Sequence, residues 1–304
     1  MTGANLVSRA TSITEWLERQ EPHQAEHEKG IRYGLAYQPQ PTDVFISSYA
    51  KCGTTWLQQI VHGLKTRGDM TFDDISRVVP WLEWAYELGL DIYAPQQGGF
   101  RAFKTHVSWH DIPKGGRYIL SVRDPKDALV SFYHFFDGFE FEAGSISISE
   151  FAREFFMRGI LGNYWDHLIS WWEHHHDHNV LLLCFEEMKL DLLGTVQTIA
   201  HFLEIDPDES LLEIVIKQSS FDFMLAHKDK FDDLLMRDFF VKMGMHPPGS
   251  DATKVRSGRV GDHRKELSAN ISGEMDDIWR KKIEAILGLA SYQALREALI
   301  QESA

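Results

Sequence analysis

Residues 43–64 read DVFISSYAKCGTTWLQQIVHGL, and this stretch decides the fold. Its first part, Asp43–Ser48, is rich in β-branched and aromatic residues and predicts a strand. Apolar residues then recur with the helical spacing i, i+3, i+4 and i+7, at Leu57, Ile60, Val61 and Leu64. This spacing predicts a helix with one buried face, so the loop before it lies at a helix N-terminus. Backbone N–H groups at such a terminus form an anion-binding site.

Three further β-rich runs follow along the chain, at Arg101–Thr105, Arg117–Val122 and Val180–Phe185. Longer segments with helical periodicity separate them. This alternation is typical of a parallel sheet with crossover helices, and it predicts the α/β class with a central sheet flanked by helices.

The chain of 304 residues has no internal repeat, low-complexity tract or long linker, which predicts one domain over residues 1–304. A helical extension is expected over about residues 1–40. Periodicity fades over residues 227–259, where several glycines and prolines occur. We expect a long surface loop there, and in a compact domain such a loop is often a lid.

The formal net charge is −14, from 31 basic and 45 acidic residues, and it disfavours nucleic acid as a partner while allowing a locally bound small anion. Cys52 and Cys184 form no CxxC pair, so neither a disulfide framework nor a cysteine zinc site is expected. The first thirty residues lack an apolar signal region, and no run of about 18 apolar residues occurs. We therefore expect a cytoplasmic protein without a membrane span.

The loop after the first strand carries groups suited to a phosphate. Gly53 lets the backbone approach a ligand, Thr54 and Thr55 offer hydroxyls, and Lys51 supplies a positive charge. Because Lys51 precedes Gly53, the order differs from the Walker A motif GxxxxGK[ST] and argues against an ordinary ATPase. A plain strand–turn–helix junction capped by Thr54 or Thr55 is the alternative interpretation.

Two other segments offer groups for an anion. In VRDPKDALVS, residues 122–131, Arg123 follows a strand and Ser131 lies two turns into a helix, so both side chains could reach one phosphate. In VRSGRVGDHRKELS, residues 255–268, basic residues surround two glycines. By itself this last segment also fits a solvated basic turn.

Together, in this order and spacing, the three segments resemble the cytosolic sulfotransferase family, whose hallmarks are a YPKSGTTW-like loop, an R-x(7)-S segment and an RKGxxGDW-like segment. The resemblance covers about residues 43–268, and FKTH, SFYHFF and FEEMK are further landmarks. It implies a fold related to P-loop nucleotide kinases. It also implies sulfuryl transfer from 3′-phosphoadenosine 5′-phosphosulfate (PAPS) to a hydroxyl of a small apolar acceptor, leaving adenosine 3′,5′-bisphosphate (PAP).

The resemblance also implies roles for individual residues. The loop that would hold the 5′-phosphosulfate comprises Lys51, Cys52, Gly53, Thr54, Thr55 and Trp56, with Lys51 on the bridging oxygen. The 3′-phosphate would be held by Arg123, Ser131, Arg256 and Gly258, with Ser257 at the position of a family lysine. The positions around adenine or its ribose are Trp56, Phe185, Ser219, Phe221 and Met224. His106 matches the catalytic base, with Lys104 beside it.

The chemistry of sulfuryl transfer needs these residue types. An acceptor proton must be removed, the groups must approach in line, and the leaving phosphate gains negative charge. Histidine, lysine and helix amides perform these tasks. A sulfuryl group carries less negative charge than a phosphoryl group, so no metal is required.

Several positions depart from the family pattern. Cys52 replaces a serine, Phe185 a tyrosine and His263 a tryptophan, and Ser257 removes one expected phosphate contact. The dimer motif KxxxTVxxxE is not intact around Arg264–Gly273, which leaves the oligomeric state open, a homo-oligomer included.

The acceptor side is expected near Trp81 and Trp84 and near Phe136, Phe139 and Phe141, with residues 227–259 closing over it. Histidines 174–176 and 178 are interpreted as a solvated helix end, and no metal site is expected. Three alternatives stay open at this point: a small-molecule or nucleotide kinase, a catalytically silent nucleotide-binding protein, and a dehydration that proceeds through a sulfate ester. The acceptor itself cannot be identified from the sequence.

Overall fold

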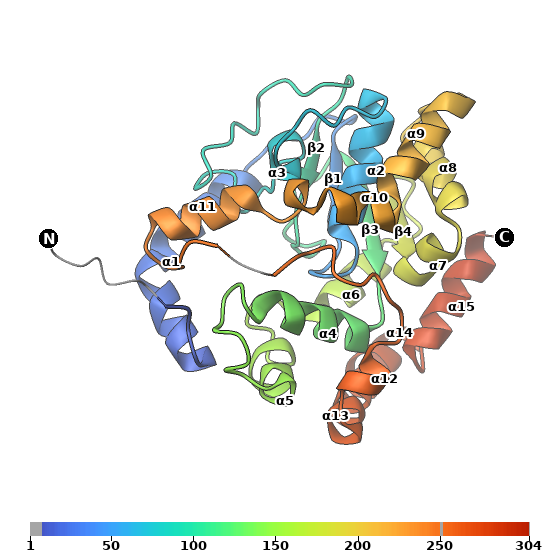
Figure 1. Cartoon of the computed structure of the whole chain (residues 1–304). Coiled ribbons are helices and arrows are strands. Elements are labelled where there is room, and N and C mark those ends of the chain that lie inside the picture. Colours follow the sequence, from blue (N-terminus) through green and yellow to red (C-terminus); the bar gives the residue numbers. More distant parts are fainter. Residues whose placement is uncertain (1–7, 250–251, 304) are drawn as a thin grey trace, which may run out of the picture.

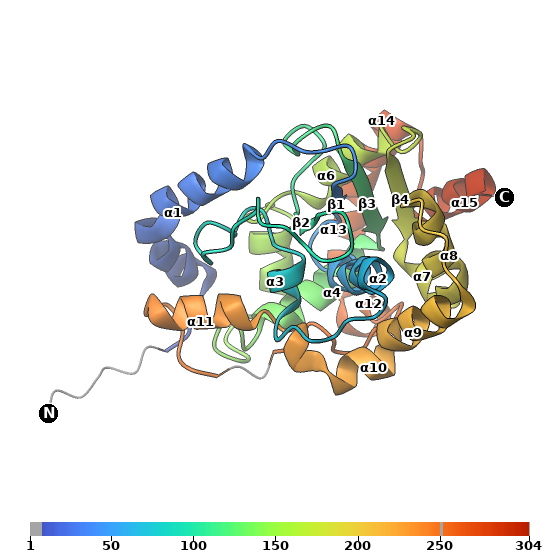
Figure 2. The ribbon, with the colours of Figure 1, turned by 90° about the horizontal axis from the view of Figure 1, so that it is seen from above.

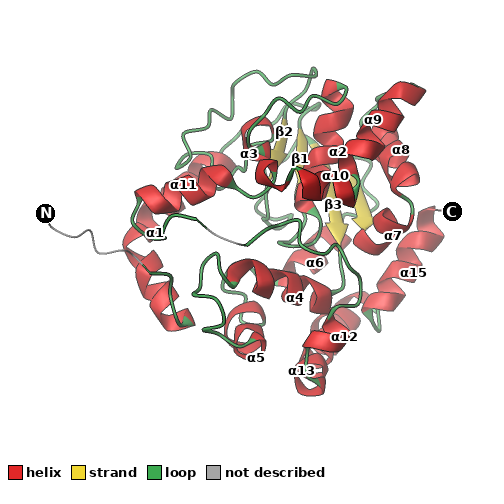
Figure 3. Ribbon diagram, viewed as in Figure 1, coloured by secondary structure: helices red, strands yellow, loops and turns green. Residues whose placement is uncertain are grey.

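A central sheet of four parallel strands organises the molecule (Figures 1 and 3). The computed structural model describes residues 8–249 and 252–303. In the sheet the order is β2-β1-β3-β4. Its strands are β1 Val44–Ile46, β2 Ala102–Lys104, β3 Arg117–Val122 and β4 Val180–Cys184. All four predicted strands are confirmed, although β1, β2 and β4 are three, two and one residues shorter than predicted.

The two faces of the sheet bury different kinds of side chain, because residues alternate between the faces of a strand. On one face, Val44, Ile46 and Ile119 belong to an aliphatic core with α2 Thr54–Thr66. On the other face, Phe45 stacks between Phe103 and Tyr118, with ring centroids 5.6 and 5.5 Å away. Both faces are therefore covered, as a parallel sheet requires.

Helices surround the sheet on both sides (Figure 2). Before β4 the helices are α1 Ile13–Leu35, α2, α3 Ile75–Val78, α4 Pro125–Phe136, α5 Ile148–Phe151 with a π-helical turn Ala152–Phe156, and α6 Tyr164–Trp172. After β4 come α7 Phe185–Leu190, α8 Leu192–Phe202, α9 Glu209–Ser219, α10 Phe221–Ala226, a 3₁₀ turn Lys228–Lys230, α11 Leu234–Lys242, α12 His263–Glu266, α13 Ala269–Trp279, a π-helical turn Arg280–Glu284, α14 Ala285–Leu287 and α15 Tyr292–Ser303. Among the described residues, no helix is both long enough and apolar enough to cross a membrane.

Helix α2 packs as its sequence predicts. Its four apolar positions are fully or almost fully buried, and the helix contacts β1, β2 and β3 as well as α9. The position of this helix fixes the loop that precedes it against the edge of the sheet.

The segment 227–259 differs from the expected loop, because residues Leu234–Lys242 form α11. Met236 and Phe240, four residues apart, are buried and hold this helix to the body of the protein. The helix is short, so its apolar stripe has only two members and gives little periodic signal. Part of the predicted lid, Ser250 and Asp251, lies outside the described residues.

Candidate active site

All four strands end at one edge of the sheet, and a predicted site residue follows each of them. Lys51 lies in the loop after β1, His106 two residues after β2, Arg123 directly after β3 and Phe185 directly after β4. Ligands bind at this edge in open α/β sheets. The topology thus gathers residues that are up to 134 positions apart in the chain around one cavity.

The loop between β1 and α2 is tightly constrained. Gly53 has a left-handed φ of 106°, and a Cβ there would lie 2.9 Å from Ser121 Oγ and 3.1 Å from the Phe185 ring. Lys51 also has a positive φ, 67°, which is uncommon for a residue with a side chain. Strained backbone of this kind occurs at functional sites, and here it turns the chain into the helix N-terminus.

The first turn of α2 presents free backbone donors. Its first helical hydrogen bond runs from Leu57 N to Gly53 O at 3.0 Å, so the amides of Thr54, Thr55 and Trp56 have no partner inside the helix. A cap by Thr54 or Thr55 is not formed, because Gly53 is the N-cap and no side chain caps this helix. The Thr54 Oγ1 atom is buried and has no partner among the described residues, as suits a ligand contact.

Arg123 joins the segments that the sequence analysis treated separately. Its Nη1 donates to the Lys51 carbonyl at 3.1 Å and its Nη2 to the Arg259 carbonyl at 3.0 Å. Its guanidinium lies 4.5 Å from the centre of the Phe185 ring. The Arg123 Nε atom is buried without a partner in the described part of the chain. One side chain thus ties three loops together.

The segment from Arg256 to His263 is anchored by Asp127 of α4. The Asp127 carboxylate accepts from Gly261 N at 2.6 Å and from His263 N at 3.1 Å, and it pairs with His263 Nδ1 at 2.8 Å. Asp262 in turn lies 3.2 Å from Ser257 Oγ and 3.6 Å from Arg256. His263, which departs from the family pattern, therefore has a structural partner.

The residues predicted around the nucleoside lie together. Trp56 Nε1 donates to the Ser219 carbonyl at 2.8 Å, and the rings of Trp56 and Phe185 are 5.6 Å apart. A Cβ on Gly258 would lie 2.9 Å from the Phe221 ring. The structure brings the whole predicted set to the cavity wall except Cys52, which is fully buried behind the loop: Lys51, Gly53, Thr54, Thr55, Trp56, Lys104, His106, Arg123, Ser131, Phe185, Ser219, Phe221, Met224, Arg256, Ser257 and Gly258.

His106 is held in one tautomer. Its Nδ1 lies 2.6 Å from the Ser48 carbonyl oxygen, which only accepts, so Nδ1 carries the proton and Nε2 keeps its lone pair. Its backbone N–H donates to Glu83 Oε1 at 2.7 Å. Burial, reinforced by the positive charge of Lys104, holds the pKa of His106 well below its ordinary value. At neutral pH the ring is therefore uncharged and able to accept a proton.

Two lysines face the same space as His106. Lys104 Nζ lies 3.5 Å from the centre of the Trp81 ring, and Lys51 Nζ lies 4.2 Å from the centre of the Phe135 ring. Burial, and after it repulsion by Lys254, lowers the pKa of each lysine to about 7. Near pH 7 each lysine therefore holds its charge only in part.

A sulfotransferase domain model matches residues 41–286, most of the chain. This chain belongs to the sulfotransferase family. A sulfotransferase 1E1 of Cavia porcellus is 33% identical over 82% of this chain and 86% of that protein. An amine sulfotransferase of Oryctolagus cuniculus is 29% identical over 80% of this chain and 81% of its own.

Solved structures show the same fold. Mouse sulfotransferase SULT7A1 complexed with PAP aligns with a TM-score of 0.65 at 24% identity, covering 91% of this chain and 94% of its own. A retinol dehydratase in complex with androsterone and inactive cofactor PAP gives a TM-score of 0.67 at 20% identity, covering 87% and 86%. With the family established, the kinase alternative loses its basis.

The cavity of this sulfotransferase has a volume of about 2020 Å³, well above the roughly 300–1,000 Å³ of common ligand pockets. Beyond His106 its wall is largely aromatic, with Trp81, Trp84, Phe136 and Phe139 at positions that the sequence analysis named and Phe239 and Phe240 added by α11. Phe141 is a correction, because it is buried against Trp16 and Phe155 in the core and does not line the cavity. Which aromatic ring of such a cluster turns inward depends on packing.

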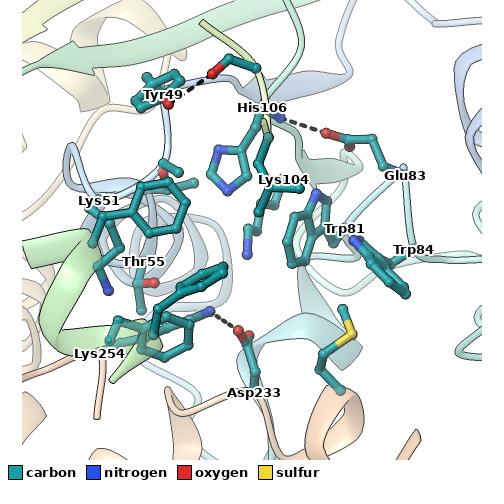
Figure 4. A pocket seen from close by; sticks show the side chains of 18 of the residues that line it. Tyr49, Lys51, Thr55, Trp81, Glu83, Trp84, Lys104, His106, Asp233 and Lys254 are labelled. Carbon is teal, nitrogen blue, oxygen red and sulfur yellow. Dashed lines mark hydrogen bonds and ion pairs between the residues drawn. The ribbon is translucent and has the colours of Figure 1, made fainter. Parts of the chain in front are cut away.

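Among the charged residues that line the cavity of the sulfotransferase, sequence reasoning missed Glu83, Asp233 and Lys254 near the proposed transfer centre. Glu83 holds the backbone of His106, and Asp233 and Lys254 form an ion pair (Figure 4). Glu83 lies in no motif, and Asp233 and Lys254 fall in the segment interpreted as a loop. The acidic pair Asp232 and Asp233, flanked directly by the apolar residues Phe231 and Leu234, was the available signal.

The histidine run of the sulfotransferase lies at the end of α6, as expected. His174 pairs with Asp177 at 2.8 Å, while His175 and His176 face Glu302 of α15 at 3.3 and 3.9 Å. His175, His176 and Glu302 each offer one possible ligand atom, and these three atoms lie within 4.8 Å of one another. A side-chain contact between the segment that follows α6 and helix α15 accounts for this arrangement, and the absence of a metal site stays a prediction.

Proposed function

We propose that this sulfotransferase transfers the sulfuryl group of PAPS to a hydroxyl of a small, apolar acceptor and releases PAP. The observation that carries the proposal is the convergence of the α2 N-terminus, Arg123 and His106 on one cavity at the carboxyl edge of the sheet. Support comes from the mouse sulfotransferase and the retinol dehydratase of the same fold, both of which were crystallised with PAP.

The donor would lie along the loop residues and the segment that Arg123 ties together. Its phosphosulfate would accept hydrogen bonds from the amides of Thr54, Thr55 and Trp56, and its 3′-phosphate from Arg123, Ser131 and the 256–258 segment. Three buried polar atoms have no hydrogen-bond partner among the described residues: Thr54 Oγ1, Arg123 Nε and Ser219 Oγ. A polar ligand bound at this place would supply partners for them.

Transfer would proceed in line. His106 Nε2 takes the acceptor proton as the acceptor oxygen attacks sulfur, and the bond from sulfur to the bridging oxygen of the donor breaks. Lys51 and Lys104 stabilise the negative charge that develops on the departing phosphate of PAP. The reaction balances with these groups and needs no metal.

The acceptor would lie against the aromatic wall. In this wall the ring of Trp84 lies 6.1 Å from that of Phe239 and 5.6 Å from that of Phe240. Apolar walls with few polar groups favour a small molecule with an apolar body, such as a phenol, a sterol or an alkanol. The retinol dehydratases of this fold were crystallised with androsterone and with retinol. The region 227–259, which includes α11, would act as the lid, and a cytoplasmic location is part of the proposal.

The decisive test uses PAPS labelled in its sulfur, with a panel of phenols, sterols, alkanols, sugars and tyrosyl peptides. We expect labelled sulfate esters of the apolar alcohols or phenols, without added metal. Preferred transfer to sugars or peptides would overturn the acceptor assignment. An unlabelled alkene together with free labelled sulfate would show that dehydration follows sulfation. Failure to transfer label to any acceptor, with PAP bound no better than AMP, would overturn the donor assignment.

A further inference from the structure

Asp233 and Lys254 form a buried ion pair inside the cavity, beside the two lysines of the proposed transfer centre (Figure 4). Their side chains are only 7% and 10% exposed. The positive charges of Lys254, Lys104 and Lys51 all act on the Asp233 carboxylate. Lys254 pairs directly with the Asp233 carboxylate, while Lys104 and Lys51 act on it only through their charges.

The backbone of Asp233 has an uncommon conformation, and its carboxylate pairs with Lys254 instead of capping α11. Asp233 is the N-cap residue of α11, yet its side chain makes no capping hydrogen bond, and its φ is left-handed at 54°. By contrast, Asp124 and Asp208 cap α4 and α9 with bonds of 2.8 Å. Asp233 therefore forgoes a favourable cap and adopts an uncommon conformation. Such strain persists where the surrounding structure requires it.

The neighbouring aspartate fixes the other half of the pair. Asp232 accepts from Lys254 N at 2.7 Å and from Thr253 Oγ1 at 2.9 Å. Lys254 thus has its backbone bound by one acid and its ammonium group by the next. The two aspartates thus connect the start of α11 to the segment just before Arg256 at the cavity wall.

The charges that face each catalytic lysine can be named. Lys51 is acted on by Lys254 and Arg123, which repel its charge, and by Asp233 and Asp232, which attract it. Lys104 is repelled by Lys254 and attracted by Asp233 and Glu83, and the neutral ring of His106 lies beside it. Burial favours the uncharged amine in both cases, so the balance of these neighbours decides how much cation is present.

We propose that Asp233 and Lys254 are a positioning pair for the transfer centre: Asp233 keeps Lys51 and Lys104 cationic, and Lys254 holds the Asp233 carboxylate beside them while limiting its attraction. The catalytic meaning of the pair rests on the proposed function, because it concerns the lysines that would stabilise the leaving group. The electrostatic effect of the pair is independent of which reaction the enzyme performs.

The test measures the protonation of each lysine directly. Competitive labelling with acetic anhydride over a pH series, analysed peptide by peptide by mass spectrometry, gives the midpoint at which each amine becomes reactive. Asp233→Asn should move the midpoints of Lys51 and Lys104 down by about one pH unit or more, and Lys254→Met should move them up. Asp233→Glu should keep both close to wild type.

Lys65 is the internal control in every sample. It is also a buried lysine, bound to Gln96 Oε1 at 2.8 Å and the Phe100 carbonyl at 2.7 Å, and it does not line this cavity. Its midpoint should stay fixed in all variants. The proposal is overturned if the midpoints of Lys51 and Lys104 do not shift, or if they shift in the same direction in Asp233→Asn and Lys254→Met. It is also overturned if the midpoint of Lys65 shifts in parallel with them.

A second readout separates the pair from the proposed function. With PAPS and an accepted alcohol, the alkaline limb of kcat/KM should move to lower pH in Asp233→Asn and to higher pH in Lys254→Met. A merely structural ion pair would lower activity without opposite shifts. Opposite shifts of the labelling midpoints in an enzyme that fails to use PAPS would uphold the pair and overturn the proposed function alone.

Discussion

The Arg123 guanidinium donates to the backbone carbonyl of Lys51 at 3.1 Å, although the two residues belong to different loops. This bond fixes the carbonyl of the residue that carries the proposed leaving-group cation. The same guanidinium binds the Arg259 carbonyl and stacks on Phe185. A planar fork is needed for all these contacts at once, so arginine and lysine are not equivalent here.

Replacing Arg123 by lysine tests its two roles. We expect the affinity for PAP to fall about 10-fold to 100-fold, because a charge-assisted contact to the 3′-phosphate contributes roughly 1.5–3 kcal/mol. The affinity for AMP should fall less, since AMP has no 3′-phosphate. Calorimetry with both ligands gives the comparison. Arg101→Lys, which alters an ion pair with Asp43 outside the cavity, is the matched control and should change neither affinity. If the affinities for PAP and AMP fell equally, Arg123 would not contact the 3′-phosphate and would only hold the loops together.

His106→Gln should lower kcat about 10²-fold or more while leaving PAP affinity near wild type, because the lost step is removal of the acceptor proton. Single-turnover rates with saturating PAPS measure the chemical step. His62→Gln is the control, because His62 is buried, also contacts a backbone carbonyl at 3.0 Å and does not line the cavity. Near-full turnover of His106→Gln would show that another group is the base.

Lys104→Met should make the protein more stable and less active. Burial lowers the pKa of Lys104 from 10.5 to about 7, so the unfolded chain binds one more proton between these values and stability rises with pH there. Below pH 7 the folded state bears the full cost of the buried charge, on the order of a few kcal/mol. Methionine removes that cost, so its advantage should be largest below pH 7 and vanish above 10.5. Denaturant unfolding of wild type and variant, below pH 7 and above pH 10.5, measures this. A stability difference between the two proteins that does not depend on pH would contradict the prediction.

Gly53→Ala should abolish donor binding, because a Cβ at Gly53 meets Ser121 and Phe185 at 2.9 and 3.1 Å and the φ of 106° disfavours any side chain. Gly144→Ala is the matched control, with a φ of 75° and open space around the added Cβ. Both variants should lose roughly 1 kcal/mol of stability from backbone strain. Only Gly53→Ala should lose PAP affinity. A donor-binding Gly53→Ala would show that the loop can move without harm.

The sequence predicted the strands and the loop after β1 well, because both depend on local patterns. Val44–Ile46 is a short apolar run followed at once by a helical stripe, and parallel strands place their carboxyl ends at one edge. The roles of His106 and Lys104 came from resemblance, and the geometry around Ser48 and Trp81 supports them without deciding the chemistry.

The residues that were missed depend on tertiary contacts. Lys254 meets Asp233 only because α11 forms where glycines and prolines suggested a loop. The Glu83 carboxylate accepts a hydrogen bond from the backbone N–H of His106. Such a contact has no sequence signature. Phe139 and Phe141 are two positions apart in one aromatic run and both are buried, but only Phe139 lines the cavity, while Phe141 packs against Trp16 of α1.

Helix α1 lies outside residues 41–286, the part that matches the family, yet Trp16, Leu17 and Gln20 contribute to the cavity wall. Gly30 and Gly34 bring the helix against Glu87 and Leu82, so closely that added methyl groups would collide with them. The part of the cavity that we propose for the acceptor is thus partly built by a segment that lies outside the shared domain. Substitutions along α1 could therefore change which alcohol is accepted while the nucleotide half stays untouched, so that acceptor choice and donor use can evolve separately.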